Sequence, residues 1–175
     1  YNIIFFMNKN ILITGGSRSG KSIFAEKLSL SFGKKPSYVA TAKNIDEEIN
    51  NRIIIHKKRR KNSWYEFEAE INLIDTLKKI DKKSPVLIDC ITIWLNNIFY
   101  EKKNWKIEVQ KLSKFISTYK QPLILVTNEV GSGIIPINKL SREFQDASGI
   151  TNQIIASVCD QVYFVVCGIP TKIKG

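Results

Sequence analysis

Short apolar runs, many of them rich in β-branched residues, alternate along the chain with longer amphipathic segments. Runs of this length, separated by helical patterns, are typical of the buried strands of a parallel sheet. We expect strands at residues 11–14, 37–41, 64–68, 86–90, 123–127 and 162–167. The pattern therefore predicts a single-domain α/β fold, with a mostly parallel sheet flanked by helices on both faces.

Two of the amphipathic segments carry apolar residues at helical spacing. The stripes are Phe24, Leu28 and Phe32 in the first segment, and Val109, Leu112, Ile116 and Tyr119 in the second. A stripe of this kind marks the helix face that packs on the core. Gly33 is expected to end the first helix, and Pro122 to mark the start of a strand.

The composition fits one compact domain. Of the 175 residues, 43% are hydrophobic and 25% are charged, which is enough apolar material for a full core. We predict that residues 7–175 form this domain and treat residues 1–6 as an upstream or added segment, because Met7 directly precedes the first strand. The 27 basic and 16 acidic residues give a net charge of +11, so phosphates or nucleic acid are plausible partners.

The cysteines and the apolar runs favour a cytoplasmic protein. Cys90, Cys159 and Cys167 form no Cys-x-x-Cys pair, so neither a zinc site nor a disulfide framework is indicated. The apolar stretches are shorter than about ten residues, too short to span a bilayer. We therefore expect no stable membrane insertion and no secretion signal.

The strongest local motif is Gly-x-x-x-x-Gly-Lys-Ser/Thr, which stands between the first expected strand and the first expected helix. Its residues are Gly15, Gly16, Ser17, Arg18, Ser19, Gly20, Lys21 and Ser22. In such a P-loop, backbone N–H groups and the helix N-terminus point at phosphate oxygens. We expect Lys21 to face solvent and to bind the β- and γ-phosphates as a catalytic cation, and Ser22 to offer its hydroxyl to Mg2+.

A carboxylate ends another buried strand. Asp89 follows the apolar run 86–88, at the usual place of a second magnesium-organising residue in P-loop enzymes. The alternative is that Asp89 only caps the segment that follows the strand.

The single histidine lies in the most basic stretch of the chain. Residues 52–61 contain six basic side chains around His56. A neutral imidazole is a competent nucleophile toward phosphorus, and neighbouring cations keep it neutral and offset developing negative charge. Two plainer interpretations stay open, namely a structural histidine on the helical stripe of Ile49 and Ile53, and a solvated run of lysines.

Taken together, six segments resemble one enzyme family. They are residues 11–22, 38–42, 52–64, 87–97, 126–136 and 141–174. The family is the bifunctional adenosylcobinamide kinase and adenosylcobinamide-phosphate guanylyltransferase of cobalamin biosynthesis. The P-loop is common to many families, whereas the Thr-Asn-Glu-Val-Gly-x-Gly-Ile-x-Pro signature at 127–136 is specific.

The resemblance implies a RecA-like P-loop fold assembled as a homotrimer. It also implies two reactions, with GTP or ATP as substrate nucleotide and Mg2+ as metal. The aminopropanol hydroxyl of adenosylcobinamide is first phosphorylated. His56 is then guanylylated by GTP, and the adenosylcobinamide phosphate takes the GMP to give adenosylcobinamide-GDP.

The resemblance also implies a set of nucleotide contacts outside the P-loop. These are Thr41, Ala42, Lys43, Arg59, Arg60, Lys61, Asn62, Glu68 and Asp89. The sequence departs from the family pattern at two places, since Lys61 replaces the usual proline and Glu66 stands where threonine is frequent. Without that proline the backbone beside His56 is less restricted.

Other functions remain open at this point. The charge and the P-loop also suit a RecA-like nucleic-acid-binding ATPase module, although most aromatic residues lie in apolar stripes, so we expect no nucleic-acid partner. A nucleotide-binding regulator without turnover is a third possibility. No general base is identifiable, and residues 138–141 lack the final Asp of the Asn-Lys-x-Asp motif that reads guanine in GTPases.

Overall fold

The computed structural model describes residues 10–42, 60 and 63–175. Within them the chain forms one seven-stranded sheet with the strand order β3-β2-β4-β5-β1-β6-β7. The strands are β1 (Asn10–Thr14), β2 (Ser37–Ala40), β3 (Tyr65–Glu68), β4 (Val86–Asp89), β5 (Leu123–Val126), β6 (Gln161–Val166) and β7 (Ile169–Lys174). Every neighbouring pair is parallel except β6 and β7. The predicted mostly parallel α/β sheet is confirmed.

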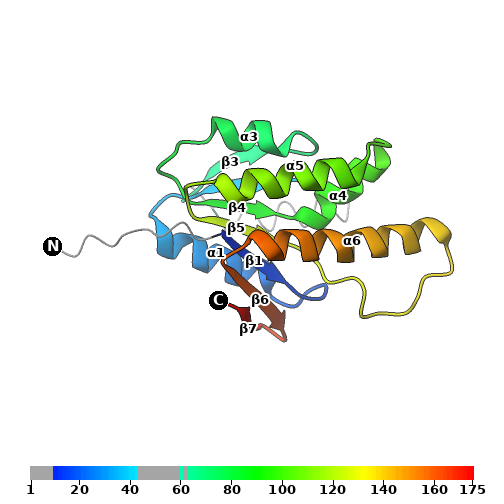
Figure 1. Ribbon diagram of the computed structural model, residues 1–175. Coiled ribbons are helices and arrows are strands. Elements are labelled where there is room, and N and C mark those ends of the chain that lie inside the picture. The colour runs from blue at the N-terminus through cyan, green and yellow to red at the C-terminus, as the bar shows by residue number, and fades with distance from the viewer. Residues whose placement is uncertain (1–9, 43–59, 61–62) are drawn as a thin grey trace.

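Helices cover both faces of the sheet. They are α1 (Lys21–Phe32), α3 (Leu73–Lys79), α4 (Ile91–Tyr100), α5 (Trp105–Thr118) and α6 (Lys139–Val158). In Figure 1, α1 lies at the lower left, apart from α3, α4 and α5 at the top. Two buried clusters follow from this arrangement, one beneath α1 and one beneath the other four helices.

The central strands are apolar throughout because both of their faces are covered. Leu12 of β1 lies in the cluster under α3, α4, α5 and α6, whereas its neighbours Ile11 and Ile13 lie in the cluster under α1. Successive side chains of a strand point to opposite faces, so each of these strands supplies both cores. This explains why their sequences read as continuous hydrophobic runs.

Both predicted helical stripes pack on the core, but one of them is less deeply buried than expected. The α5 residues Val109, Leu112 and Ile116 are buried as expected, but Phe24, Leu28 and Phe32 of α1 are only half-buried. The fully buried positions of α1 include Ala25 and Ser29. Small side chains let the helix approach the sheet closely, so the larger residues pack at the flanks of the contact.

The hairpin at the C-terminal end was missing from the sequence prediction. Cys167 and Gly168 connect β6 to β7 with φ angles of 52° and 79°. Positive φ at both central residues is what a tight turn between antiparallel strands requires. Pro170 lies in β7, and proline is tolerated there because β7 is an edge strand.

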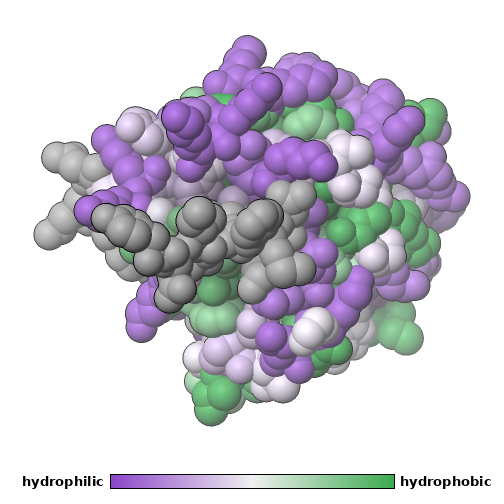
Figure 2. All heavy atoms as spheres, turned by 60° about the vertical axis from the view of Figure 1, so that its left-hand side comes forward, coloured by the Kyte–Doolittle hydropathy of each residue, from purple (hydrophilic) through white to green (hydrophobic). Residues whose placement is uncertain are grey.

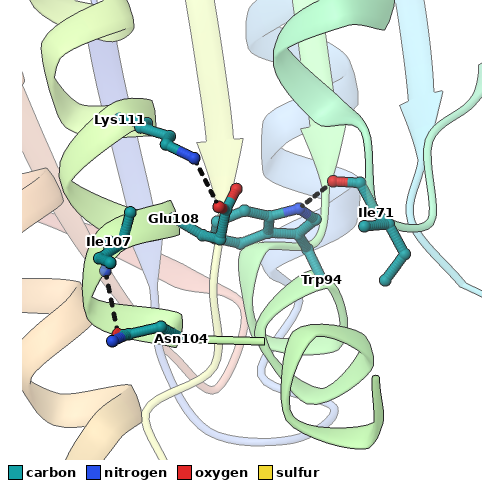
Figure 3. Close-up of polar contacts among 6 residues, drawn as sticks. All are labelled: Ile71, Trp94, Asn104, Ile107, Glu108 and Lys111. Carbon is teal, nitrogen blue, oxygen red and sulfur yellow. Dashed lines mark hydrogen bonds and ion pairs between the residues drawn. The ribbon is translucent and has the colours of Figure 1, made fainter. Parts of the chain in front are cut away.

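The segment before α5 shows how local polar contacts set the helix boundaries (Figure 3). The side chain of Asn104 accepts a hydrogen bond from the backbone N–H of Ile107 at 3.3 Å, which caps α5. One turn later, Lys111 pairs with Glu108 at 2.8 Å.

Trp94 of α4 donates its indole N–H to the carbonyl of Ile71 at 2.9 Å, which ties α4 to the segment before α3.

None of the helices in the described part of the chain is both long enough and apolar enough to cross a bilayer.

We expect Asn104→Ala to lower the free energy of unfolding by about 1 kcal/mol, because it removes the cap of α5. Lys111→Ala is the control, since it removes only an exposed ion pair and should cost less than about 0.5 kcal/mol. Urea unfolding followed by circular dichroism measures both changes. Equal effects of the two substitutions would contradict the assignment of a stabilising cap.

Candidate active site

The P-loop connects β1 to α1 and has the strand and helix context that the motif requires. Gly15 and Gly20 have φ angles of 148° and 96°, which side chains of L-residues rarely adopt. A Cβ at Gly15 would collide with the carbonyl oxygen of Val165, and one at Gly20 would lie 3.0 Å from Cα of Gly168. Both glycines are therefore required by conformation and by packing.

Two neighbouring loops hold the P-loop in place through its carbonyls. Gly168, in the β6–β7 turn, donates its N–H to the carbonyl of Ser19 at 2.8 Å. Glu129, in the loop after β5, donates its N–H to the carbonyl of Gly15 at 3.0 Å. These contacts engage carbonyls, so they do not compete with an anion for the N–H groups at the start of α1. No acidic residue stands in the first turn of that helix, which suits a phosphate site.

Lys21 is not solvent-facing, contrary to expectation. It is 6% exposed, and its ammonium donates to the carbonyl of Gly16 at 2.6 Å. Burial lowers the pKa of Lys21, and the neighbouring Asp89 opposes that shift. Burial raises the pKa of the Cys90 thiol to about 12, so the thiol is neutral near pH 7 and Asp89 is the anion that acts on Lys21. The Lys21 ammonium therefore lies against the backbone of the P-loop, whose bound phosphates it is expected to contact.

Asp89 is the last residue of β4 and lies at the carboxyl edge of the sheet. It accepts a hydrogen bond at Oδ2 from the hydroxyl of Tyr38 at 3.0 Å. Ser22, the second residue of α1, is half-buried. Both predicted metal ligands thus offer oxygen, the donor that Mg2+ prefers, close to the phosphate loop.

The described residues suit a metal held mainly by phosphates. Among them, no three His, Cys, Asp or Glu side chains come together in a way that could hold a metal ion. Mg2+ in nucleotide sites usually keeps several waters and takes one or two protein ligands together with substrate phosphates. Ser22 and Asp89 fit that pattern, and Mg2+ bound there would neutralise charge on the transferring phosphate.

Thr41 has a structural role that the sequence did not indicate. It is fully buried, and its hydroxyl donates to the carbonyl of Cys90 and accepts from the Cys90 N–H, both at 2.8 Å. Its own carbonyl accepts from Asn97 of α4 at 2.9 Å. Thr41 therefore joins the ends of β2 and β4. The predicted contact of Thr41 and half-buried Ala42 with nucleotide stays a prediction.

Arg60 is the one predicted nucleotide ligand of the basic segment that the structure describes, and it is 3% exposed. Its guanidinium pairs with Glu66 at 3.0 Å and lies over the ring of Tyr38, 3.5 Å from the ring centroid. Its Nη1 is buried without a hydrogen-bond partner among the described residues. A buried cationic donor of this kind fits an anionic ligand.

The remaining predicted contacts fall in two groups. Lys43, His56, Arg59, Lys61 and Asn62 lie outside the described residues. Glu68 ends β3 with its side chain exposed, and it borders a groove of about 440 Å³ that Asn72, Asp75 and Lys79 also line.

A polar network behind the P-loop was not anticipated. The hydroxyl of Thr127, just after β5, contacts the Thr92 hydroxyl at 3.1 Å and donates to Asn152 of α6 at 2.8 Å. The N–H of Asn128 donates to Thr92 at 2.7 Å. The specific signature at 127–136 was visible in the sequence, but its partners on α4 and α6 were not. This network holds the start of the loop that contacts Gly15.

Glu129 shapes the same loop. Its carboxylate accepts from the N–H groups of Gly131 at 2.6 Å and Ser132 at 3.1 Å. A hydrogen bond from the Ser132 hydroxyl, together with these two backbone bonds, holds the pKa of Glu129 below its ordinary value. The carboxylate is therefore engaged by the backbone of its own loop.

A P-loop between a buried parallel strand and a helix, with a strand-end carboxylate beside its lysine, defines a P-loop nucleotide-binding protein. Residues 11–173 match the family model of cobinamide kinase / cobinamide phosphate guanyltransferase. The chain belongs to this family.

Curated relatives match over nearly the whole chain. The bifunctional adenosylcobalamin biosynthesis proteins CobP of Pseudomonas aeruginosa and CobU of Salmonella typhimurium are each 38% identical to it, over 94% of this chain and 96% and 99% of theirs. The corresponding CobU of Escherichia coli is 34% identical, over 94% of this chain and 99% of its own.

Solved structures share the fold at low sequence identity. A protein from Pyrococcus horikoshii OT3 has a TM-score of 0.53 at 11% identity, covering 95% of this chain and 86% of its own. The P4 protein of bacteriophage phi6, solved in complex with ADP, has a TM-score of 0.52 at 9% identity, over 93% of this chain and 52% of its own. These likenesses concern the fold alone.

We expect Lys21→Ala to reduce phosphoryl transfer from a nucleoside triphosphate by about a hundredfold or more, because one preorganised cation is lost from the phosphate site. Lys27→Ala, an exposed lysine of the same helix, is the matched control and should behave like the wild type. Steady-state kinetics with labelled nucleotide and thermal unfolding are measured for each. A folded Lys21→Ala variant with wild-type turnover would contradict the role assigned to Lys21.

Proposed function

We propose that this protein phosphorylates adenosylcobinamide with a nucleoside triphosphate and then transfers GMP from GTP to the product, adenosylcobinamide phosphate. The match of residues 11–173 to a family named for both activities is the observation that carries this proposal. The P-loop that connects β1 to α1 supplies its physical basis. The products are a nucleoside diphosphate from the first step, and adenosylcobinamide-GDP and pyrophosphate from the second.

In the kinase step, the aminopropanol hydroxyl oxygen of the substrate attacks the γ-phosphorus. The bond to the bridging oxygen of the β-phosphate breaks, and the hydroxyl proton is released. Backbone N–H groups of residues 15–20 and the ammonium of Lys21 hold the phosphate oxygens as negative charge shifts during transfer. The same role is proposed for Arg60, and its Nη1, which is buried and without a hydrogen-bond partner among the described residues, supports this.

In the guanylyl step, a neutral nitrogen of His56 attacks the α-phosphorus of GTP and pyrophosphate leaves. An oxygen of the substrate phosphate then attacks the same phosphorus, which returns the imidazole and forms the new diphosphate bond. His56 is the only histidine of the chain and stands among six basic residues. Those cations favour the neutral imidazole and offset charge on the phosphate.

We propose GTP as the guanylyl donor, GTP or ATP as the phosphoryl donor, and Mg2+ held by Ser22 and Asp89. Lys43, Arg59, Lys61, Asn62 and Glu68, with Thr41 and Ala42, complete the proposed nucleotide contacts. The nucleic-acid-binding ATPase is not proposed, because the family match accounts for the P-loop and the basic segment without it.

We propose one domain over residues 7–175, which functions as a homotrimer in the cytoplasm. The free state of all three cysteines supports a reducing compartment. In Figure 1 the segment between β5 and α6 extends away from the rest of the molecule. Ile134, Ile135 and Ile137 in this segment are 94%, 75% and 98% exposed. Grouped apolar side chains of such exposure favour burial against another subunit.

On the face that Figure 2 shows, hydrophilic residues dominate the upper part and hydrophobic residues lie between them in smaller groups.

We expect the Ile134→Lys/Ile137→Lys double variant to lose the trimer, because it places charge in the proposed contact. Sedimentation equilibrium should show the mass fall from three times 20.0 kDa to 20.0 kDa. Ile107→Lys, at an exposed position of α5, is the control and should stay trimeric. A trimer that survives the double substitution would place the contact elsewhere.

We expect GTP labelled with ³²P at the α-phosphate to leave an acid-labile, base-stable label on the protein, because the bond formed is a phosphoramidate. GTP labelled at the γ-phosphate should leave none. His56→Ala and His56→Asn should lose the label and guanylyl transfer together, yet still phosphorylate cobinamide.

Label that persists in a His56 variant would place the nucleophile on another residue. Loss of both activities in a folded variant would mean that His56 positions nucleotide and does not attack it. Absence of phosphorylated cobinamide with the wild type would refute the kinase proposal.

A further inference from the structure

A series of side-chain contacts leads from the edge strand β3 to the candidate metal carboxylate. Glu66 pairs with Arg60, Arg60 lies over the ring of Tyr38, and the Tyr38 hydroxyl donates to Asp89. Trp64 meets the ring of Tyr38 edge-on, with centroids 6.0 Å apart. All of these contacts are on the side of the sheet that α1 covers, where Tyr38 and Trp64 share a buried cluster with Ala25.

The strand register explains how these side chains meet. Tyr38 of β2 lies directly opposite Glu66 of β3 on one side and Leu87 of β4 on the other. Asp89 is two residues beyond Leu87, so it points to the same face as Leu87 and lies diagonally from Tyr38. Long aromatic side chains reach a diagonal neighbour of this kind. The Tyr38 ring therefore spans from the Arg60–Glu66 pair to the carboxyl edge of the sheet.

We propose that Tyr38 is a positioning residue for phosphoryl transfer, which orients the Asp89 carboxylate toward the magnesium–nucleotide complex. This inference rests on the proposed function, because it takes Asp89 as a metal ligand. The hydroxyl engages Oδ2 and restricts rotation of the carboxylate, as partners behind metal ligands do.

Arg60 and Glu66 hold the ring of Tyr38 from the other side. Glu66 Oε1 accepts from Arg60 Nε at 3.1 Å and pairs with Nη2 at 3.0 Å, so two nitrogens of the guanidinium fork are engaged. With those contacts made, the guanidinium plane stays over the Tyr38 ring at 3.5 Å. Glu66 therefore holds the side chain of Arg60 in place. Glu66 and Lys61, the residue that follows Arg60, are the two departures from the family pattern.

The decisive variant is Tyr38→Phe, which removes the hydroxyl and keeps the ring. Binding of Mn2+ to the protein with guanosine 5′-(β,γ-imido)triphosphate is followed by electron paramagnetic resonance. We expect the Mn2+ dissociation constant to rise about tenfold, as for the loss of other partners of metal ligands. Affinity for the same nucleotide in EDTA should not change. Asp89→Asn is the reference for the change in the Mn2+ dissociation constant, because it alters the proposed metal ligand itself.

Glu66→Gln tests the same path without altering the core. It should raise the Mn2+ dissociation constant in the same direction but less, by about threefold, because the hydrogen bond from Tyr38 remains. Combined with Tyr38→Phe it should add little, since both changes act through one carboxylate. If Tyr38→Phe does not fold, the Glu66→Gln result decides alone.

The matched controls are Tyr65→Phe, at a half-exposed tyrosine of β3, and Glu143→Gln, in an exposed ion pair of α6. Both should leave Mn2+ binding unchanged. Mn2+ curves of Tyr38→Phe that superimpose on those of the wild type, or an equal shift in Tyr65→Phe, would overturn the inference. The Mn2+ measurement needs no turnover, so an inactive wild type would refute the proposed function and leave this test intact.

Discussion

Close backbone packing around Gly15 and Gly20 determines the shape of the phosphate loop, and the rest of the site depends on it. The carbonyl of Val165 and Cα of Gly168 occupy the space that a side chain would need at these two positions. Both atoms belong to the C-terminal end of the chain, in β6 and the turn that follows. The loop is therefore formed by contacts between segments about 150 residues apart, as well as by its own sequence.

The parallel sheet brings other predicted site residues to its carboxyl edge. Asp89 ends β4, Glu68 ends β3, and Thr41 directly follows β2. Carboxyl ends of parallel strands meet at one edge, where ligands bind in open α/β sheets. Hydrogen bonds across this edge then fix the spacing, because Thr41 holds Cys90 and Thr127 holds Asn152.

The two faces of the sheet bury different kinds of side chain. Under α3, α4, α5 and α6 lies the larger apolar core, with Trp94 and Leu112 fully buried. Under α1, ionisable groups enter the buried layer, among them Lys21 and Arg60. Buried charges are costly unless they are paired or bind a ligand. Their position on one face is consistent with chemistry on the α1 side and stability on the other.

Sequence alone was sufficient for the α/β class, six of the seven strands within the described residues, and the P-loop. Continuous apolar runs and a glycine-rich motif at a strand end are local signals, so they can be read without knowing what packs against them. The resemblance to the kinase and guanylyltransferase family likewise came from local motifs, and the family match confirms it.

Tertiary structure decided what depends on neighbours distant in the sequence. The burial of Lys21, the small residues at the sheet contact of α1 and the strand after Gly168 all depend on close packing that no local pattern records. The same holds for the path from Glu66 to Asp89, which exists because β3, β2 and β4 are adjacent in the sheet but not in order along the chain. Strand order and register are set by the global arrangement of buried surfaces, and that arrangement placed a tyrosine hydroxyl on a carboxylate 51 residues away.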